Sequence, residues 1–561
     1  MDRTAWLSAD QVAALKAGFT MPTGALGANV GEAGWSYALA DGALDFLGRD
    51  DVARVVTTVQ VSDGHGGVAN QDVVVTLSGI NDAPTFTTAP GRASVTETAG
   101  PTGSNALLTA QGSAGFADLD LTDAHTVAVS MQGRGFIGAM TASVVTDTTA
   151  GGAGRVVWNW SAPDKALDFL GAGQTLDQTY TLTLSDGKGG VVRQDVVVTL
   201  VGTDDLPSIT GSTGATWYEG TAVNHARSGT LTFADADLTD HLTVSFAGQS
   251  VSYTSVSGAD LTASLTADQV AALKAAFTMP TGDLGANRGT ATWTYAIADK
   301  ALDFIGQNDT VRVVTTVQVN DGNGGVAQQA VTIALKGVND APVIVAGGQV
   351  TGSVTEKAGA YGDASLHLTG GSFDFADIDL SDVHAVRVTS KGAGYLGALS
   401  ATVSADTTGG GAGHVAWSFQ VADKALDALA AGQSVTQTYA VQVGDGKSGF
   451  ATQDVTVTLT GSADQFVFSG LTKKALPSFG AGDQLVFSAS ALGHQVGPGA
   501  LAAEWFTEGT AATVSGHGQF VHDVAHKQLL WDADGTGGGA AVTVATFATP
   551  ANLHAQDFFI V

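Results

Sequence analysis

Short runs in which apolar and polar residues alternate recur along this chain, and they come in pairs around glycine-rich turns. One pair is residues 180–185 and residues 194–200, which flank an Asp-Gly-Lys-Gly-Gly turn at residues 186–190. Alternation with a period of two predicts strands that bury one face, and glycine permits the positive φ of a tight hairpin turn. The pattern predicts a β-hairpin, and turn geometry alone explains its aspartate.

The same hairpin pattern occurs four times. Its turns begin at Asp63, Asp186, Asp321 and, in a degraded copy, Asp445. Each turn starts 28 residues after a tryptophan, namely Trp35, Trp158, Trp293 and Trp417. Self-similarity at a fixed offset indicates one structural unit repeated in tandem.

An acidic turn that ends in proline follows each of the first three hairpins, at residues 81–84, 204–207 and 339–342. Proline donates no backbone hydrogen bond and stiffens the residue before it, which suits a short joint between domains. Division at these joints predicts module 1 (residues 1–84), module 2 (85–207), module 3 (208–342), module 4 (343–461) and a C-terminal domain (462–561).

The modules alternate in type. Residues 8–24 nearly duplicate residues 266–282, and both copies begin with a capping-box pattern that predicts a short helix. Modules 2 and 4 carry glycine-rich loops at that place, so the duplicated unit is a pair of modules. Module 1 lacks the first part of the repeat. We expect either that the chain is part of a longer array, which we favour, or that its first domain is incomplete.

Composition narrows the choice of partners. The chain has 24 Lys and Arg against 53 Asp and Glu, a net charge of −29, so it repels nucleic acid and anionic membranes and attracts cations. Extracellular modules usually rely on disulfides, but this chain has no cysteine. No run approaches the roughly 20 apolar residues of a membrane span. We therefore expect neither nucleic-acid binding nor a membrane span. The absence of cysteine leaves two alternatives, a cytosolic protein or a protein stiffened by bound metal.

Motifs of common enzymes are missing from the sequence. No histidine is followed by glutamate, which excludes the usual His-Glu-x-x-His zinc site, and there is neither a Gly-x-Ser-x-Gly elbow nor a phosphate-binding P-loop. Carboxylates are abundant, but they recur in every module, which argues against a single active centre. We therefore expect no catalytic residues and no enzymatic activity.

Carboxylates gather around the predicted joints in three recurring motifs. The first is a glutamate near the start of modules 2, 3 and 4, at Glu97, Glu219 and Glu356. The second is Phe-Ala-Asp-x-Asp-Leu-Thr/Ser-Asp, whose first two acids are Asp118 and Asp120, Asp235 and Asp237, and Asp377 and Asp379. The third is Ala-Leu-Asp, ending at Asp45, Asp168, Asp303 and Asp427. Each joint thus gathers many oxygen ligands, which favours Ca²⁺, although solvated turn residues remain the alternative.

Together, the Asp-Gly-x-Gly-Gly turn, the Asn-Asp-Ala-Pro joint and the Ala-Leu-Asp block resemble the VCBS repeat of bacterial surface proteins. More distantly, they are similar to cadherin domains. The resemblance covers residues 1–461. It implies an all-β fold of tandem antiparallel β-sandwiches of cadherin/immunoglobulin-like type, followed here by a small β-rich C-terminal domain.

In cadherins, calcium at a joint is held by a glutamate, a Leu-Asp-x-Glu motif, the linker acids and an Asp-x-Asp motif. Carried over, the ligands between modules 2 and 3 are Glu97, Asp168, Asp204, Asp205, Asp235 and Asp237. Those between modules 3 and 4 are Glu219, Asp303, Asn339, Asp340, Asp377 and Asp379. Those of the first joint are Asp45, Asn81, Asp82, Asp118 and Asp120. The second acid of Leu-Asp-x-Glu is replaced by Leu47, Leu170 or Ile305, so we expect fewer or weaker ions than in a cadherin joint.

The sequence pattern of the modules does not continue after residue 464. The Asp-x-Asp-Gly hairpin at Asp532 and Asp534 and the apolar end of the chain resemble the C-terminal domain of RTX-type exported proteins. This resemblance implies an uncleaved signal for the type I secretion machinery. Asp532 and Asp534 are candidate Ca²⁺ ligands, although such a tip is nearly as often a simple turn.

The two resemblances predict a Ca²⁺-stiffened structural stalk of a large secreted bacterial adhesin, which is extracellular or attached to the cell surface. Its expected partners are the secretion machinery and a surface glycan or protein as the adhesive target. The main alternative is a spacer or carbohydrate-binding accessory region of a secreted hydrolase. A surface-layer protein that assembles into sheets is a third alternative.

Overall fold

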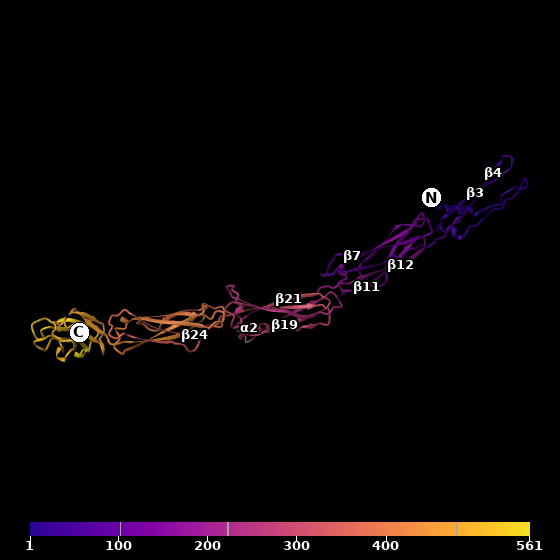
Figure 1. The fold of residues 1–561 in the computed structure, drawn as a ribbon. Coiled ribbons are helices and arrows are strands. Elements are labelled where there is room, and N and C mark those ends of the chain that lie inside the picture. Colours follow the sequence, from indigo (N-terminus) through magenta and orange to yellow (C-terminus); the bar gives the residue numbers. More distant parts are fainter. Residues whose placement is uncertain (101, 221–223, 478) are drawn as a thin grey trace.

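The computed structural model describes residues 1–100, 102–220, 224–477 and 479–561. Figure 1 shows an extended row of β-rich bodies, with strands β3 and β4 at one end and the C-terminal domain (yellow) at the other. The strands are numerous, and many of them pair with strands that are not their neighbours in the sequence, such as β6 with β12. The expected all-β class of tandem sandwiches is confirmed. No helix in the described part of the chain is long and apolar enough to cross a membrane.

Module 2 is a sandwich of two four-stranded sheets, ordered β5-β7-β10-β9 and β6-β12-β11-β8. The first sheet contains β5 (Thr85–Phe86), β7 (Leu107–Ala117), β10 (Gly154–Pro163) and β9 (Ala139–Thr146). The second contains β6 (Arg92–Thr96), β12 (Val191–Val201), β11 (Thr175–Ser185) and β8 (Thr126–Met131). All pairs are antiparallel except β6 with β12, and Trp158 and Trp160 fill the space between the sheets.

Module 3 has the same layout with sheets β13-β15-β19-β17 and β14-β21-β20-β16-β18. Its strands are β13 (Ser208–Gly211), β14 (Gly214–Tyr218), β15 (Asn224–Ala234), β16 (Thr243–Thr254), β17 (Phe277–Thr278), β18 (Gly282–Asp283), β19 (Arg288–Ala298), β20 (Thr310–Asn320) and β21 (Val326–Lys336). Helix α2 (Ala267–Ala275) is capped by Thr266, whose side chain accepts from the backbone of Gln269. The predicted short helix is present, and Phe277 begins β17 soon after its end.

Module 4 repeats module 2, with sheets β22-β24-β27-β26 and β23-β29-β28-β25. Its strands are β22 (Val343–Ile344), β23 (Thr351–Thr355), β24 (Leu366–Ala376), β25 (Ala385–Ser390), β26 (Ala398–Ala405), β27 (Gly413–Ala422), β28 (Ser434–Gly444) and β29 (Phe450–Thr460). In the second sheet, β23 is parallel to β29, as β6 is parallel to β12 in module 2. Trp417 and Phe419 lie in its core.

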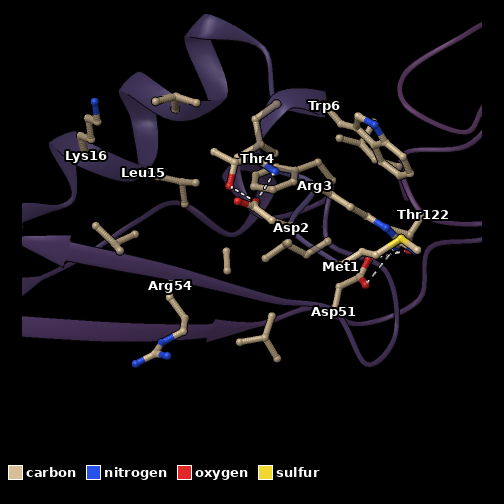
Figure 2. Close-up of a pocket in the computed structure, with 18 of the residues that line it drawn as sticks. Met1, Asp2, Arg3, Thr4, Trp6, Leu15, Lys16, Asp51, Arg54 and Thr122 are labelled. Carbon is tan, nitrogen blue, oxygen red and sulfur yellow. Dashed lines mark hydrogen bonds and ion pairs between the residues drawn. The ribbon is translucent and has the colours of Figure 1, made fainter.

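Module 1 contains only part of this layout. Its elements are α1 (Ala9–Ala17), β1 (Phe19–Thr20), β2 (Ser36–Tyr37), β3 (Val52–Ser62) and β4 (Val68–Ser78). Strands β3 and β4 form a two-stranded sheet with both outer edges unpaired. A groove of about 640 Å³ lies between the N-terminal segment, α1 and strand β3. Figure 2 shows residues that line it, among them Met1, Leu15 and Arg54.

The C-terminal domain has two mixed sheets, β30-β32-β38-β33 and β31-β37-β36-β35-β34. Its strands are β30 (Gln465–Phe468), β31 (Lys474–Leu476), β32 (Gln484–Phe487), β33 (Gly499–Ala500), β34 (Phe506–Glu508), β35 (Gln519–Asp523), β36 (Gln528–Asp532), β37 (Val542–Phe547) and β38 (Phe558–Ile560). Stacked phenylalanines such as Phe468 and Phe487 build its core. Among the described strands, four of its pairs are parallel, such as β30 with β32, whereas modules 2, 3 and 4 have one parallel strand pair each.

Candidate metal centres at the joints

The joint between modules 2 and 3 holds two adjoining groups of carboxylates. The first, here called the upper cluster, contains Glu97 after β6, Asp168 after the turn that follows β10, and Asp205 of the linker. One carboxylate oxygen of each lies within 4.8 Å of the others. Two residues that are far apart in the sequence of module 2 and one residue of the linker thus converge on one point.

The second group, here called the lower cluster, belongs mostly to module 3. It consists of Asp204, Asp235, Asp237, Asp240 and Asp321. Within it, Asp204, Asp237 and Asp240 form one set, and Asp235, Asp240 and Asp321 another, each with oxygens within 4.8 Å of one another. Since Asp240 belongs to both sets, the lower cluster is continuous.

Many oxygens of both clusters are buried without a hydrogen-bond donor. In the upper cluster these are Glu97 Oε1 and Asp205 Oδ2. In the lower cluster they are Asp204 Oδ1, Asp235 Oδ2, Asp237 Oδ1, Asp240 Oδ2 and Asp321 Oδ2. A buried carboxylate without a partner is costly, and a cation in contact with several of them removes that cost. All-oxygen donors with this excess of negative charge fit Ca²⁺ better than any transition metal.

Electrostatics lead to the same conclusion. Burial, together with the charges of neighbouring carboxylates, raises the pKa of Glu97 and of Asp205 to about 7. Burial likewise raises the pKa of Asp235 to about 6. Without a cation these acids resist ionisation at neutral pH, which is the behaviour expected of like charges forced together.

Backbone hydrogen bonds hold the clusters in place. The amide of Asp205 donates to Asp237 Oδ2 at 2.9 Å, and the amide of Thr203 donates to Glu97 Oε2 at 2.9 Å. The amide of Leu238 donates to the carbonyl of Phe169 across the joint at 3.4 Å. The linker is thus tied to a carboxylate of each module, so a change at the clusters reaches both modules.

The next joint repeats this arrangement. Glu219, Asp303 and Asp340 form its upper cluster, and the amide of Asp340 donates to Asp379 Oδ2 at 2.9 Å. Burial raises the pKa of Glu219 to about 7 and that of Asp379 to about 8. Asp377 accepts from His384 Nε2 at 3.1 Å, so its carboxylate is oriented from within module 4.

Asn339 of that joint makes two hydrogen bonds through Nδ2, one of them to the carbonyl of Asp340 at 3.0 Å. Its Nδ2 atom donates to Asp445 Oδ2 at 3.1 Å, and its Oδ1 atom is buried without a donor. Asn81 of the first joint has the same arrangement with Asp186, at 3.0 Å. Both asparagines present an oxygen to the joint while their nitrogen binds a turn aspartate.

The first joint is less complete. The amide of Asp82 donates to Asp120 Oδ2 at 2.8 Å, and burial followed by the charge of Asp45 raises the pKa of Asp82. Asp118 lies with Asp123 and Asp186 in a set whose oxygens are within 4.8 Å of one another. On the module 1 side of this joint, the acids whose charges act on Asp82 are Asp45 and Asp41, and no glutamate is among them.

Sequence reasoning missed two kinds of ligand. One is the last acid of the Phe-Ala-Asp-x-Asp-Leu-Thr/Ser-Asp motif, and the other is the aspartate of the glycine turn. At the joint of modules 2 and 3 these are Asp240 and Asp321 of the lower cluster, and at the first joint they are Asp123 and Asp186. In Asp321, Oδ1 accepts from the backbone of residues 323–325, while Oδ2 faces the joint without a donor. Turn geometry therefore explains one oxygen of the turn aspartate and leaves the other available as a ligand.

Two groups of predicted ligands lie outside these three joints. Glu356 lies where module 4 meets the C-terminal domain. Asp532 and Asp534 lie at the end of β36, where Asp534 Oδ2 accepts from the amide of Gly539 at 2.9 Å. The amide of Asp534 donates to Asp532 Oδ1 at 3.4 Å, so this pair shapes its own hairpin turn.

Solved structures similar to this chain include several cadherin ectodomains. Extracellular cadherin domains 1–5 of protocadherin gamma B2 align with 12% identity over 90% of this chain and 81% of that chain, with a TM-score of 0.30. The protocadherin gamma B4 extracellular domain aligns with 15% identity over 95% and 72%, with a TM-score of 0.32. Mouse cadherin-23 EC22–24 aligns with 13% identity over 68% and 100%, with a TM-score of 0.28.

These identities and TM-scores are low, so the fold assignment rests on the strand order and pairing described above. A scan against protein-family models gives no match. A search of curated proteins gives no match either.

Proposed function

We propose that this chain is the calcium-stiffened stalk of a large secreted bacterial adhesin that is exported by type I secretion and acts at the cell surface or in biofilms. The observation that supports calcium binding is the set of buried, donor-free carboxylate oxygens at the joints. The upper and lower clusters would hold the ions, and bound Ca²⁺ would supply charge neutralisation. The residues of this chain would then fix the relative positions of neighbouring modules.

The physical reason is the arrangement of charges. Without a cation, carboxylates of the linker and of two modules repel one another in a poorly hydrated space. Compensation of that repulsion lets the linker amides and carboxylates keep the contacts seen here, such as Asp205 N to Asp237 Oδ2. A string of modules with ordered joints behaves as a rod, which suits a stalk that carries a binding part away from a surface.

Small-angle scattering and calorimetry on the whole chain test this proposal. We expect calcium to increase the maximum dimension and to raise the melting temperature, compared with chelator. The double variant Glu97→Gln/Asp205→Asn should lose part of both effects. Asp268→Asn, an exposed acid on α2, is the matched control and should behave like the unaltered chain. An identical length and melting temperature with and without calcium would overturn the proposal.

Export is tested separately. We infer from the resemblance of residues 462–561 to RTX-type C-terminal domains that this region addresses the chain to a type I exporter. A reporter fused to residues 462–561 should appear in the medium of cells that carry such an exporter, and a fusion to residues 343–461 should not. Equal release of both fusions would contradict the assignment. Glycan and cell-surface protein arrays probed with the full chain would identify an adhesive target.

A further inference from the structure

A fourth group of buried carboxylates lies where module 4 meets the C-terminal domain, although that domain has a different fold. Glu356, Asp427 and Asp464 each stand 259 residues after a member of the upper cluster of the second joint, namely Glu97, Asp168 and Asp205. The amide of Ser462 donates to Glu356 Oε2 at 2.7 Å, the counterpart of the Thr203 contact with Glu97.

We propose that Glu356, Asp427 and Asp464, with Asp483 of the C-terminal domain beside them, form a calcium site that fixes the C-terminal domain to module 4. The inference extends the calcium binding proposed for the other joints to a junction between unlike domains. Calcium is the appropriate cation for the same reason as there, since every side-chain donor is a carboxylate oxygen.

Burial and missing donors support the site independently of the repeat. Glu356 is 3% exposed and Asp464 is 2% exposed, yet Glu356 Oε1 and Asp464 Oδ1 have no hydrogen-bond donor. Both acids are close enough to Asp427 and Asp483 for the charges to interact. Two buried, donor-free oxygens that share the same acidic neighbours require a cation or protons.

The C-terminal domain positions Asp483 through elements of its own fold. Asp483 lies directly before β32, and its Oδ2 accepts from the amide of Gly480 at 2.8 Å. Its Oδ1 accepts from the amide of Asp464 at 3.0 Å. Asp237 makes the corresponding contact with Asp205 at 2.9 Å. An unrelated fold thus places a carboxylate where the modules place the second acid of their Asp-x-Asp motif.

Only half of the usual joint is present here. Ala463 stands at the position that corresponds to Asp204, and the C-terminal domain has no Phe-Ala-Asp-x-Asp motif. The upper cluster is kept and the lower cluster is lost. We therefore expect this junction to take up fewer calcium ions than the joint between modules 2 and 3.

The site is connected to the domain contact through the loop of residues 357–363. The amide of Gly362 donates to Asp427 Oδ2 at 3.0 Å, and the amide of Gly359 donates to the carbonyl of Ala463 at 2.7 Å. Between them, the ring of Tyr361 lies 4.5 Å from that of Phe466, at the edge of the C-terminal core. A cation held by Asp427 and Asp464 therefore steadies the loop that presses Tyr361 onto the C-terminal domain.

Calorimetric calcium titration and hydrogen exchange on the full chain test this site. In the unaltered chain we expect calcium to slow exchange by about tenfold or more in residues 357–363 and 464–487. Glu356→Gln/Asp464→Asn should abolish that slowing and reduce calcium uptake, while residues 203–240 keep their calcium response. The matched variant Glu97→Gln/Asp205→Asn should show the reverse pattern.

The outcomes separate this inference from the proposed function. If calcium protects the joint of modules 2 and 3 but not residues 357–363 and 464–487, the fourth site is wrong and the stalk proposal stands. If calcium protects neither region, both are wrong. Tyr361→Ala, which leaves the carboxylates intact, should retain the calcium uptake of the unaltered chain but lose protection of residues 464–487. Unchanged protection in that variant would contradict the coupling through the loop.

Discussion

Modules 1 and 3 carry nearly the same sequence in different surroundings. Residues 54–61 and residues 312–319 are identical, as are helices α1 and α2. In module 3, Val319 is fully buried, whereas its counterpart Val61 is 52% exposed. The same residues therefore form the same strands in both places, and what differs is how much of each strand is covered.

The difference comes from strands that module 1 lacks. In module 3, β14, β15 and β16 pair with β21, β19 and β20, and they close the sandwich over its valines. Residues 1–84 contain no counterpart of these strands, so β3 and β4 keep free edges and the groove of Figure 2 stays open. The local sequence pattern is enough to form the hairpin, whereas burial of its valines requires strands that are distant in the sequence.

The largest expected effect concerns the tryptophan shared by both modules. Trp293 is 1% exposed and its Nε1 donates to the carbonyl of Ser212, whereas its counterpart Trp35 is 48% exposed. Trp293→Ala should destabilise module 3 by about 3–5 kcal/mol, and Trp35→Ala should change stability by less than about 1 kcal/mol. Differential scanning calorimetry of the full chain resolves the affected transition. Equal decreases in melting temperature for the two variants would mean that module 1 has a closed core.

The second effect concerns the aspartate of the glycine turn. Asp321 and Asp63 cap the same turn, but Asp321 also reaches the lower cluster while Asp63 is exposed. Asparagine can still accept the turn hydrogen bonds and removes only the charge. Asp321→Asn should weaken calcium binding at the second joint by about tenfold or more, since losses outside the ligand shell already cost that much.

Asp63→Asn is the control for this variant, and calorimetric titration is the measurement. Asp63→Asn should leave calcium affinity unchanged, because Asp63 is exposed and its Oδ1 accepts from the amides of His65 and Gly67. A similar loss in both variants would show that the turn, and not the ligand, is responsible.

Much of this architecture could be predicted from the sequence, and the exceptions have physical causes. The hairpins and the capping boxes follow from periodicity and from local motifs, and the gathering of Glu97 with Asp168 and Asp205 follows from the resemblance to cadherin joints. The role of Asp321 could not be predicted, because a turn aspartate and a ligand aspartate look alike until the neighbouring module is in place. Asp483 could not be predicted either, because it belongs to a domain of a different fold that lacks the motifs of the modules.

A smaller effect is expected from pH in the absence of calcium. Burial raises the pKa of Glu219 in module 3 to about 7. A folded-state pKa above the usual value of about 4 means that the folded chain holds the proton more tightly, so stability is largest at low pH and is lost as the pH rises through about 7. In chelator, the melting temperature of module 3 should be higher at about pH 5.5 than at about pH 8.

Two comparisons check the sign of this effect. Glu219→Gln should reduce the pH dependence of module 3. Asp63 has the opposite behaviour, because hydrogen bonds from the amides of His65 and Gly67 lower its pKa, so any stability it contributes is lost at low pH. A melting temperature in chelator that falls steadily from pH 8 to pH 5.5 would contradict the assignment of protons to the joint acids.

The smallest effect concerns the capped helix, which the two modules share. Ser8 and Thr266 cap α1 and α2 with the same pair of hydrogen bonds, and Tyr37 and Tyr295 donate to the carbonyls of Leu15 and Leu273 on the helices. Since both helices are capped and packed alike, Ser8→Ala and Thr266→Ala should each cost about 1 kcal/mol. Hydrogen exchange of the helix amides measures both costs in one chain. A much smaller cost in module 1 would show that the open groove weakens the helix as well as the sheet, and that an unfinished sandwich loses order throughout.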